Sequence, residues 1–238
     1  MRASDRAYRA LLAEIQTGTL AAGAVLSETE QAGRLGVSRT PLREAIARLT
    51  ADGLVQQQSP RVTIVTPIDS ADIVALFDLR RALEETAARL AARRDDRTAF
   101  VALADEFDSA SVEGESAREA YYALIARFDA ALDAAAENDY LAAALRTVRT
   151  HLVRVRRLAR HKPGRLAASV GEHRLIAQAI AAGDPDLAAH ATHVHLHNAV
   201  SSILSSLDEV PSARTPGPRS RPEGPRSPGP GAFIEGAA

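Results

Sequence analysis

The first 66 residues carry three short stretches in which apolar residues recur at helical spacing. Residues that start or stop helices bound each stretch: Gly18 ends the first, Ser27 precedes the second, Gly36 ends it, and Ser38 precedes the third. The third stretch places its apolar residues on one face: Leu42, Ala45, Ile46 and Leu49. Two β-favouring runs, "LVQQQ" and "RVTIV", follow Gly53. The pattern predicts three helices, the last two forming a helix-turn-helix, and then a β-hairpin wing.

From about residue 70 the pattern changes to long helical stripes with hardly a strand signal. Breaks at "RRDD", "VEGES", "ENDY", "HKPGR" and "AGDPD" divide this segment into about six helices. In the last break, Gly183 ends one helix, Asp184 can cap the next, and Pro185 takes its first position. The spacing predicts an all-helical bundle over residues 70–207.

The last 31 residues, 208–238, are rich in Pro, Gly, Ser and Arg and hold few large apolar side chains. Such a segment cannot bury enough apolar surface to offset the entropy of ordering the chain, so we expect a disordered tail. The predicted fold is therefore mainly α. It combines a winged helix-turn-helix over residues 1–66, a helical domain over residues 70–207, and this tail.

Composition restricts the partners and the compartment. The net charge of the whole chain is −1, so attraction to a polyanion must come from a local patch. Residues 1–66 hold eight arginines against six acidic residues, a net charge of +2. The chain has no cysteine, which excludes disulfides, thiolate metal sites and cysteine nucleophiles. The N-terminus lacks the apolar core of a signal peptide and no long uncharged apolar stretch follows, so we expect a cytoplasmic protein without a membrane span.

Arginines mark the start of the third predicted helix. Arg39 and Arg43 are four residues apart, so their side chains leave the same face near the helix N-terminus, where a recognition helix meets DNA. Arginine suits both guanine and phosphate, and Ser38 and Thr40 add hydroxyl groups. A solvated helix face would give the same pattern. The helix-turn-helix context with a wing favours DNA binding.

The segment "VLSETEQAGRLGVSRTPLREAIARLTADGLV" resembles the winged-helix DNA-binding domain of the GntR family of bacterial transcription regulators. The second half resembles the helical ligand-binding domain of its FadR subgroup, and together the resemblance covers roughly residues 5–207. It implies that five residues contact operator DNA: Ser38, Arg39, Thr40, Arg43, and Arg61 in the wing. Two departures are Gln31, where the family usually has an apolar residue, and the wing "SPRV", which lacks the common tip glycine.

Polar residues interrupt apolar faces in the second half. Asp129 lies four residues after Ile125 on a face that otherwise reads as core, and His173 shares a face with Ile176 and Ile180. Imidazoles and a carboxylate from separate helices suit Zn²⁺ or Ni²⁺. Hydrogen-bonded core histidines are the alternative.

The resemblance to the FadR subgroup implies a metal held by an Asp and a His four residues apart on one helix, with two His from later helices. His173 in "EHRLI" and His195 in "HVHL" take the two later places. Ile125, however, stands where the subgroup has its Asp, and Asp129 stands where it has its first His. We therefore expect either a divalent metal on Asp129, His173 and His195, or a metal-free polar pocket.

Arg80 and Glu84 are four residues apart and extend another apolar stripe. Arg80 is a candidate to meet the carboxylate of an effector through its guanidinium, as the resemblance implies for this helix, and Arg149 is a second candidate. A structural ion pair is the alternative for Arg80 and Glu84.

Together these features predict a homodimeric, effector-responsive transcription regulator, a repressor that binds a palindromic operator in double-stranded DNA and is released by a small carboxylate. No stretch resembles a phosphate-binding loop or a nucleophile elbow, so we expect no catalytic residues and no enzyme. Two alternatives are a metal-dependent helical enzyme fused to a DNA-binding module and a scaffold whose bundle serves only for dimerisation.

Overall fold

The structure is a computed structural model that describes residues 1–158 and 163–208. In this part of the chain it contains nine helices and one two-stranded sheet. The N-terminal unit consists of α1 (Ala3–Thr17), α2 (Glu28–Leu35), α3 (Arg39–Ala51), β1 (Val55–Ser59) and β2 (Val62–Val65). The bundle consists of α4 (Ser70–Ala92), α5 (Thr98–Asp108), α6 (Glu115–Ala136), α7 (Asp139–Leu158), α8 (Pro163–Ala181) and α9 (Pro185–Asp208).

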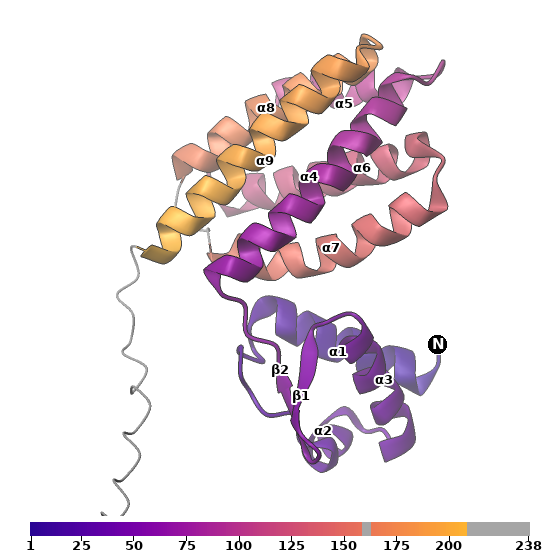
Figure 1. Ribbon diagram of the computed structural model, residues 1–238, viewed down its shortest axis with the longest axis vertical. Helices are drawn as coiled ribbons and strands as arrows, with labels where there is room; N and C mark the ends of the chain where they lie inside the picture. Colours follow the sequence, from indigo (N-terminus) through magenta and orange to yellow (C-terminus); the bar gives the residue numbers. More distant parts are fainter. Residues whose placement is uncertain (159–162, 209–238) are drawn as a thin grey trace, which may run out of the picture.

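Figure 1 shows the bundle stacked on the N-terminal unit, with α7 on the side of the bundle that faces α1. The mainly α fold, the six helices of the bundle and the two-stranded wing are confirmed. From residue 209 on, the tail predicted over 208–238 lies outside the described residues.

The N-terminal unit forms where its start and stop signals lie. The hydroxyl of Ser27 accepts a hydrogen bond from the backbone N–H of Glu30 at 3.4 Å, and Gly36 ends α2 with a φ of 62°. Leu42 and Leu49 of α3 are fully buried against α1 and β1, and burial of each leucine contributes roughly 1.5–3 kcal/mol. Ser38 differs from expectation: it occupies the N-cap position of α3, but its side chain makes no capping hydrogen bond.

The wing is larger than its two predicted strands. β1 and β2 pair antiparallel, and Val25 adds an isolated antiparallel bridge to Ile64 of β2. The backbone N–H of Leu26 donates to the carbonyl of Thr63 at 2.8 Å. The segment before α2 therefore lies along the edge of the wing and fixes its position relative to the helices.

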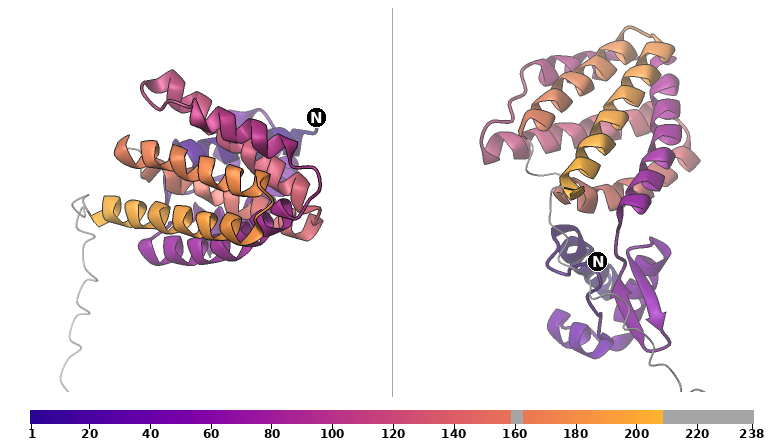
Figure 2. Two further views of the ribbon diagram at one scale, coloured as in Figure 1. Left: turned by 90° about the horizontal axis from the view of Figure 1, so that it is seen from above. Right: turned by 60° about the vertical axis from the view of Figure 1, so that its left-hand side comes forward.

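The bundle has an aromatic core. Phe107 packs edge-to-face with Phe128 and with Tyr121, at ring centroid distances of 5.8 and 6.3 Å. The predicted cap at the α8–α9 junction is present, since the Asp184 carboxylate accepts from the N–H of Leu187 at 2.9 Å. Figure 2 shows α4 and α9 side by side along one face of the bundle. No helix among the described residues is long and apolar enough to cross a membrane.

Candidate functional sites

The first turns of α3 and the turn of the wing carry the exposed residues expected at DNA: Ser38, Arg39, Thr40, Arg43 and Arg61. Arg39 donates to the hydroxyl of Thr29 at 3.3 Å, and the Nε of Arg43 lies 3.6 Å from a carboxylate oxygen of Glu28. Both contacts reach back to α2 and leave the guanidinium groups at the surface, the Arg43 side chain being 72% exposed. Contacts this exposed contribute little to stability, so both arginines are available to an anionic partner.

Arg48 on the same helix has a different role. Its guanidinium pairs with Asp5 at 2.8 Å and lies 4.1 Å above the ring centroid of Tyr8, so it ties α3 to α1. The hydroxyl of Tyr8 in turn donates to the carboxylate of Asp52 at 2.6 Å. Burial and this hydrogen bond raise the pKa of Tyr8 to about 12. Arg48 is half exposed but is held against α1, so Arg39 and Arg43 are the arginines of α3 that do not contact α1 in this way.

Gln31, the departure from the family pattern, lies buried in α2 with 4% of its surface exposed. Its side-chain oxygen accepts hydrogen bonds from Arg34, at 3.0 Å from Nε and 2.5 Å from Nη2. Arg34 also donates hydrogen bonds to both carboxylate oxygens of Glu14 on α1, at 2.6 and 2.7 Å. The polar residue therefore helps to join α2 to α1, since a buried amide needs such partners.

Inside the bundle, Arg80 and Glu84 form a buried ion pair within α4. The Nε of Arg80 donates to Glu84 at 2.9 Å and its Nη2 at 3.3 Å, while the guanidinium lies 4.7 Å from the ring centroid of Phe77. Burial alone would raise the pKa of Glu84, but the charge and hydrogen bonds of Arg80, together with the charge of Arg149, outweigh burial and lower it. The structure thus places Arg80 in the ion pair that the sequence left as an alternative to effector binding.

Arg149 of α7 reaches two carboxylates of α6. Its Nη1 donates to Asp133 at 2.7 Å, and its Nε lies 3.4 Å from an oxygen of Asp129. Burial opposes its charge, but these carboxylates raise the pKa of Arg149 on balance. Its Nε and Nη2 are buried and make no hydrogen bond within the described part of the chain. Sequence reasoning did not single out Asp133, although an acid four residues after Asp129 lies on the same helix face.

His173 of α8 and His195 of α9 are buried next to each other, with ring centroids 4.3 Å apart. The Nδ1–H of His173 donates to the carbonyl of Ser169 at 2.8 Å, and the Nδ1–H of His195 donates to Glu172 at 2.7 Å. Burial lowers the pKa of His195. Sequence reasoning missed the role of Glu172, which also accepts from Arg165 at 2.6 Å.

These residues do not form the metal site that the resemblance implies. Ile125, in the place of the Asp ligand, is buried among apolar side chains. Asp129 contacts Arg149, so a metal ion on Asp129 would lie close to the positive guanidinium. Two like unit charges about 4 Å apart repel each other by roughly 4 kcal/mol near a protein surface, and the repulsion of a divalent ion is stronger. No group of three or more His, Cys, Asp or Glu side chains within residues 1–158 and 163–208 is arranged to hold a metal ion.

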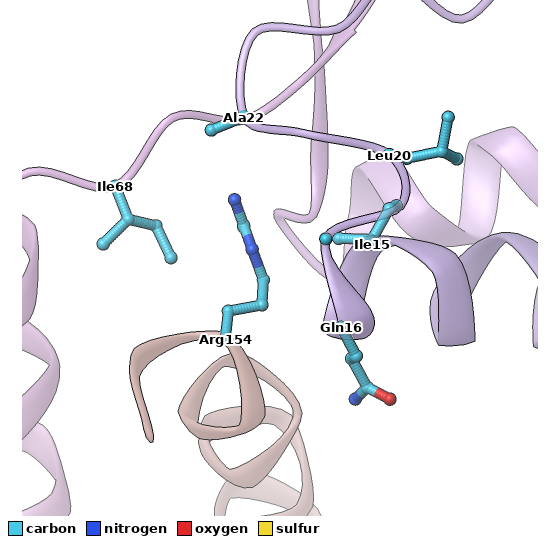
Figure 3. A pocket seen from close by; sticks show the side chains of 7 residues that line it. Ile15, Gln16, Leu20, Ala22, Ile68 and Arg154 are labelled. Atoms are coloured by element: carbon cyan, nitrogen blue, oxygen red, sulfur yellow. The ribbon is translucent and has the colours of Figure 1, made fainter. Parts of the chain in front are cut away.

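Helix α7 also connects the bundle to the N-terminal unit, which the sequence did not predict. His151 donates through Nε2 to the carbonyl of Asp52 at 2.8 Å, and Arg154 donates to the carbonyl of Thr66 at 2.5 Å. A cavity of about 90 Å³ lies at this junction, between Ile15, Ile68 and other residues. Figure 3 shows the Arg154 side chain extending into it from α7.

A winged helix-turn-helix with exposed arginines, attached to a helical bundle with a buried polar site, defines a ligand-responsive DNA-binding regulator. Residues 3–65 match the family described as bacterial regulatory proteins, gntR family, and residues 75–198 match the FCD domain. The chain belongs to the GntR family and carries an FCD C-terminal domain. It is an effector-responsive, DNA-binding transcription regulator.

Two relatives and two solved structures illustrate the match. The "Probable D-xylose utilization operon transcriptional repressor" of Paenarthrobacter nicotinovorans is 33% identical over 78% of this chain and 82% of its own length. The transcriptional repressor RspR of Escherichia coli K12 is 37% identical over 37% of this chain and 39% of its own. A GntR regulator from Rhodococcus sp. RHA1 has a TM-score of 0.66 at 24% identity, covering 85% of this chain and 97% of that chain. Escherichia coli McbR/YncC has a TM-score of 0.68 at 18% sequence identity, covering 87% of this chain and 99% of that chain. Both structures support the fold alone.

Proposed function

We propose that the protein is a repressor of the FadR subgroup that acts in the cytoplasm as a homodimer. Two copies of the N-terminal unit bind the half-sites of a palindromic operator, and a small carboxylate in the FCD bundle releases them. The order of the two domains and the names of the relatives support this proposal. We place the domain boundaries at residues 1–66 and 70–207, close to the two family matches.

We assign the operator contacts to Ser38, Arg39, Thr40, Arg43 and Arg61. The support is that all five are exposed and that four of them lie at the start of α3. The N-terminal turns of a recognition helix are the part that meets base edges. Arg43 is the residue we expect to read a base, because an arginine can donate two hydrogen bonds to guanine.

The observation that carries the proposed response is the position of α7. One side of this helix presents Arg149 to the carboxylates of α6, while His151 and Arg154 contact the N-terminal unit. A ligand that binds one position of α7 more tightly than another would shift the orientation of the N-terminal unit. Effector binding and operator spacing would then be coupled through one rigid helix.

A divalent metal and a catalytic activity are not part of this proposal. Asp129 is engaged with Arg149, and Ile125 offers no ligand atom. The alternative of a metal-dependent enzyme therefore has no observation in its favour. His173 and His195 remain in the proposal as polar residues of the effector site.

The test is operator selection with the full-length protein from random duplexes, followed by fluorescence anisotropy across a salt series. We expect sequence-specific, salt-dependent binding to a palindrome and a stoichiometry of two chains per site. Small carboxylates that stabilise the protein should weaken this binding. Binding without sequence preference, or carboxylates that bind and leave operator affinity unchanged, would contradict the proposed function.

A further inference from the structure

Arg80 and Arg149 both carry positive charge into the bundle, but their hydrogen bonds differ. Arg80 already donates twice to Glu84. Arg149 donates through Nη1 to Asp133, while its Nε and Nη2, both buried, make no hydrogen bond within the described residues. Buried donors of this kind require an acceptor. Of the two, Arg149 is therefore the arginine with donors left for a ligand, and Arg165 of α8 likewise has a buried Nη1 that makes no hydrogen bond within the described residues.

The two donors that make no hydrogen bond lie on one edge of the guanidinium, with Nε in an ion pair with Asp129 at 3.4 Å. Nε–H and Nη2–H point in the same direction and form a fork that fits the two oxygens of a carboxylate. Asp133 holds the opposite side of the group, and Asp129 lies close to Nε. A guanidinium fixed in this way is oriented before a ligand arrives, which reduces the entropy lost on binding.

Arg149 also stands where a metal would otherwise supply the positive charge. It contacts Asp129, at the position of a family metal ligand, and its charge helps to lower the pKa of Glu84. Glu84 belongs to α4, which packs against both the helix of Arg149, α7, and the helix of His195, α9. Ile125 removes one oxygen ligand that a metal would need, and its side chain packs into the apolar core.

We propose that this sensor binds its effector without a metal, and that the guanidinium of Arg149 replaces the metal as the cation that meets the effector's carboxylate. This inference rests on the proposed function, because it refines how the same site recognises a ligand. It assigns the direct contact to Arg149 and leaves Arg80 as the internal counter-ion of Glu84. His173 and His195 then contribute polar contacts to the ligand and not coordination bonds.

The first experiment is elemental analysis of full-length protein purified without an affinity tag, incubated with Zn²⁺ or Ni²⁺ and desalted. We expect a negligible amount of metal in the wild-type chain. The triple variant Ile125→Asp, Asp129→His, Arg149→Met restores the family ligands, removes the guanidinium that repels a divalent ion, and should retain about one ion per chain. About one ion per wild-type chain that disappears in Asp129→Ala would overturn the proposal, and a triple variant without metal would contradict the roles given to Ile125, Asp129 and Arg149.

The second experiment tests the guanidinium with acetate, malonate, succinate and citrate as probes, measuring affinity by thermal shift. Arg149→Lys keeps the charge beside Asp129 and Asp133 but loses the fork, so the variant should fold and bind the best probe at least about tenfold more weakly. The matched control is Arg127→Lys, which alters an exposed ion pair with Glu106 and should bind like the wild type.

Unchanged affinity in Arg149→Lys, or a wild-type chain that none of the four carboxylates stabilises, would overturn the assignment of Arg149. Operator binding by the same preparations separates this outcome from failure of the proposed function. If the wild-type protein binds its operator specifically but Arg149→Lys responds to carboxylates as the wild type does, only the guanidinium inference fails. If specific operator binding is absent, the proposed function itself fails.

Discussion

The imidazole of His151 on α7 donates through Nε2 to the backbone carbonyl of Asp52, at 2.8 Å. This bond joins the sensor bundle to the turn that follows the recognition helix. Gly53, the next residue, has a φ of +72°, and a Cβ placed there would lie 3.5 Å from the imidazole Cε1. The turn is therefore shaped by glycine and covered by a side chain of the other domain.

Replacing Gly53 with alanine should destabilise the protein by about 1–2 kcal/mol, because residues with a side chain disfavour the left-handed region. The contact with His151 adds little, since 3.5 Å is an ordinary van der Waals distance. Urea denaturation measures the change. The matched control is Gly33→Ala within α2, which meets no atom within 4 Å and should stabilise by about 0.5–1 kcal/mol. Equal effects at the two positions would contradict this explanation.

Acid should weaken the junction through His151. Burial lowers the pKa of His151 below its ordinary value, and the charge of Arg154 lowers it further, while the carbonyl and the carboxylate of Asp52 act against this. The folded protein therefore favours the neutral imidazole. Stability from this group is fully present above the ordinary pKa of about 6.5 and decreases as the pH falls below that value toward the depressed pKa.

The measurement is the free energy of unfolding of wild-type protein and of His151→Gln between pH 7.5 and 5.5. We expect the stability advantage of the wild type to shrink as the pH falls, since Gln keeps a donor for Asp52 but does not titrate. Using the difference between the two proteins removes the contribution of the other histidines. A difference that stays constant or grows toward low pH would exclude a depressed pKa at His151.

Much of the fold could be predicted from the sequence because its signals are local. Apolar spacing, the cap at Ser27 and the turn at Gly36 act within a few residues, and α2 forms over the predicted range. The edge pairing of Val25 with Ile64 could not be predicted in this way, because it joins residues 39 apart in the chain that carry no shared pattern.

The site was predictable only in part. Helical spacing predicts that His173 faces inward, the family resemblance indicates His195, and the two residues do lie together. What each polar group contacts depends on how helices pack: Asp129 contacts Arg149, and His195 contacts Glu172. The junction through His151 and Asp52 depends on how the two domains lie relative to each other, which periodicity within one helix does not determine.

Arg43→Ala should weaken specific operator binding by about 1–3 kcal/mol, through lost base or phosphate contacts. Arg48→Ala on the same helix is the matched control, because Arg48 pairs with Asp5 and covers the ring of Tyr8. We expect the control to lower the melting temperature and to leave operator affinity unchanged. Anisotropy titrations and thermal denaturation of both variants distinguish DNA contact by Arg43 from structural packing by Arg48. An equal loss of DNA affinity in the two variants would contradict this assignment.

The buried pair in α4 should show strong coupling between its members. Arg80→Met removes the charge that keeps Glu84 ionised in the core, and breaking a buried pair in this way costs about 3–5 kcal/mol. The double variant Arg80→Met, Glu84→Met removes both charges and should recover most of that loss, because no buried charge remains unpaired. Urea denaturation of Arg80→Met, of Glu84→Met and of the double variant gives the coupling energy between the two residues. Additive losses would show that Arg80 and Glu84 do not neutralise each other, and Arg80 would again become a candidate for direct contact with the effector.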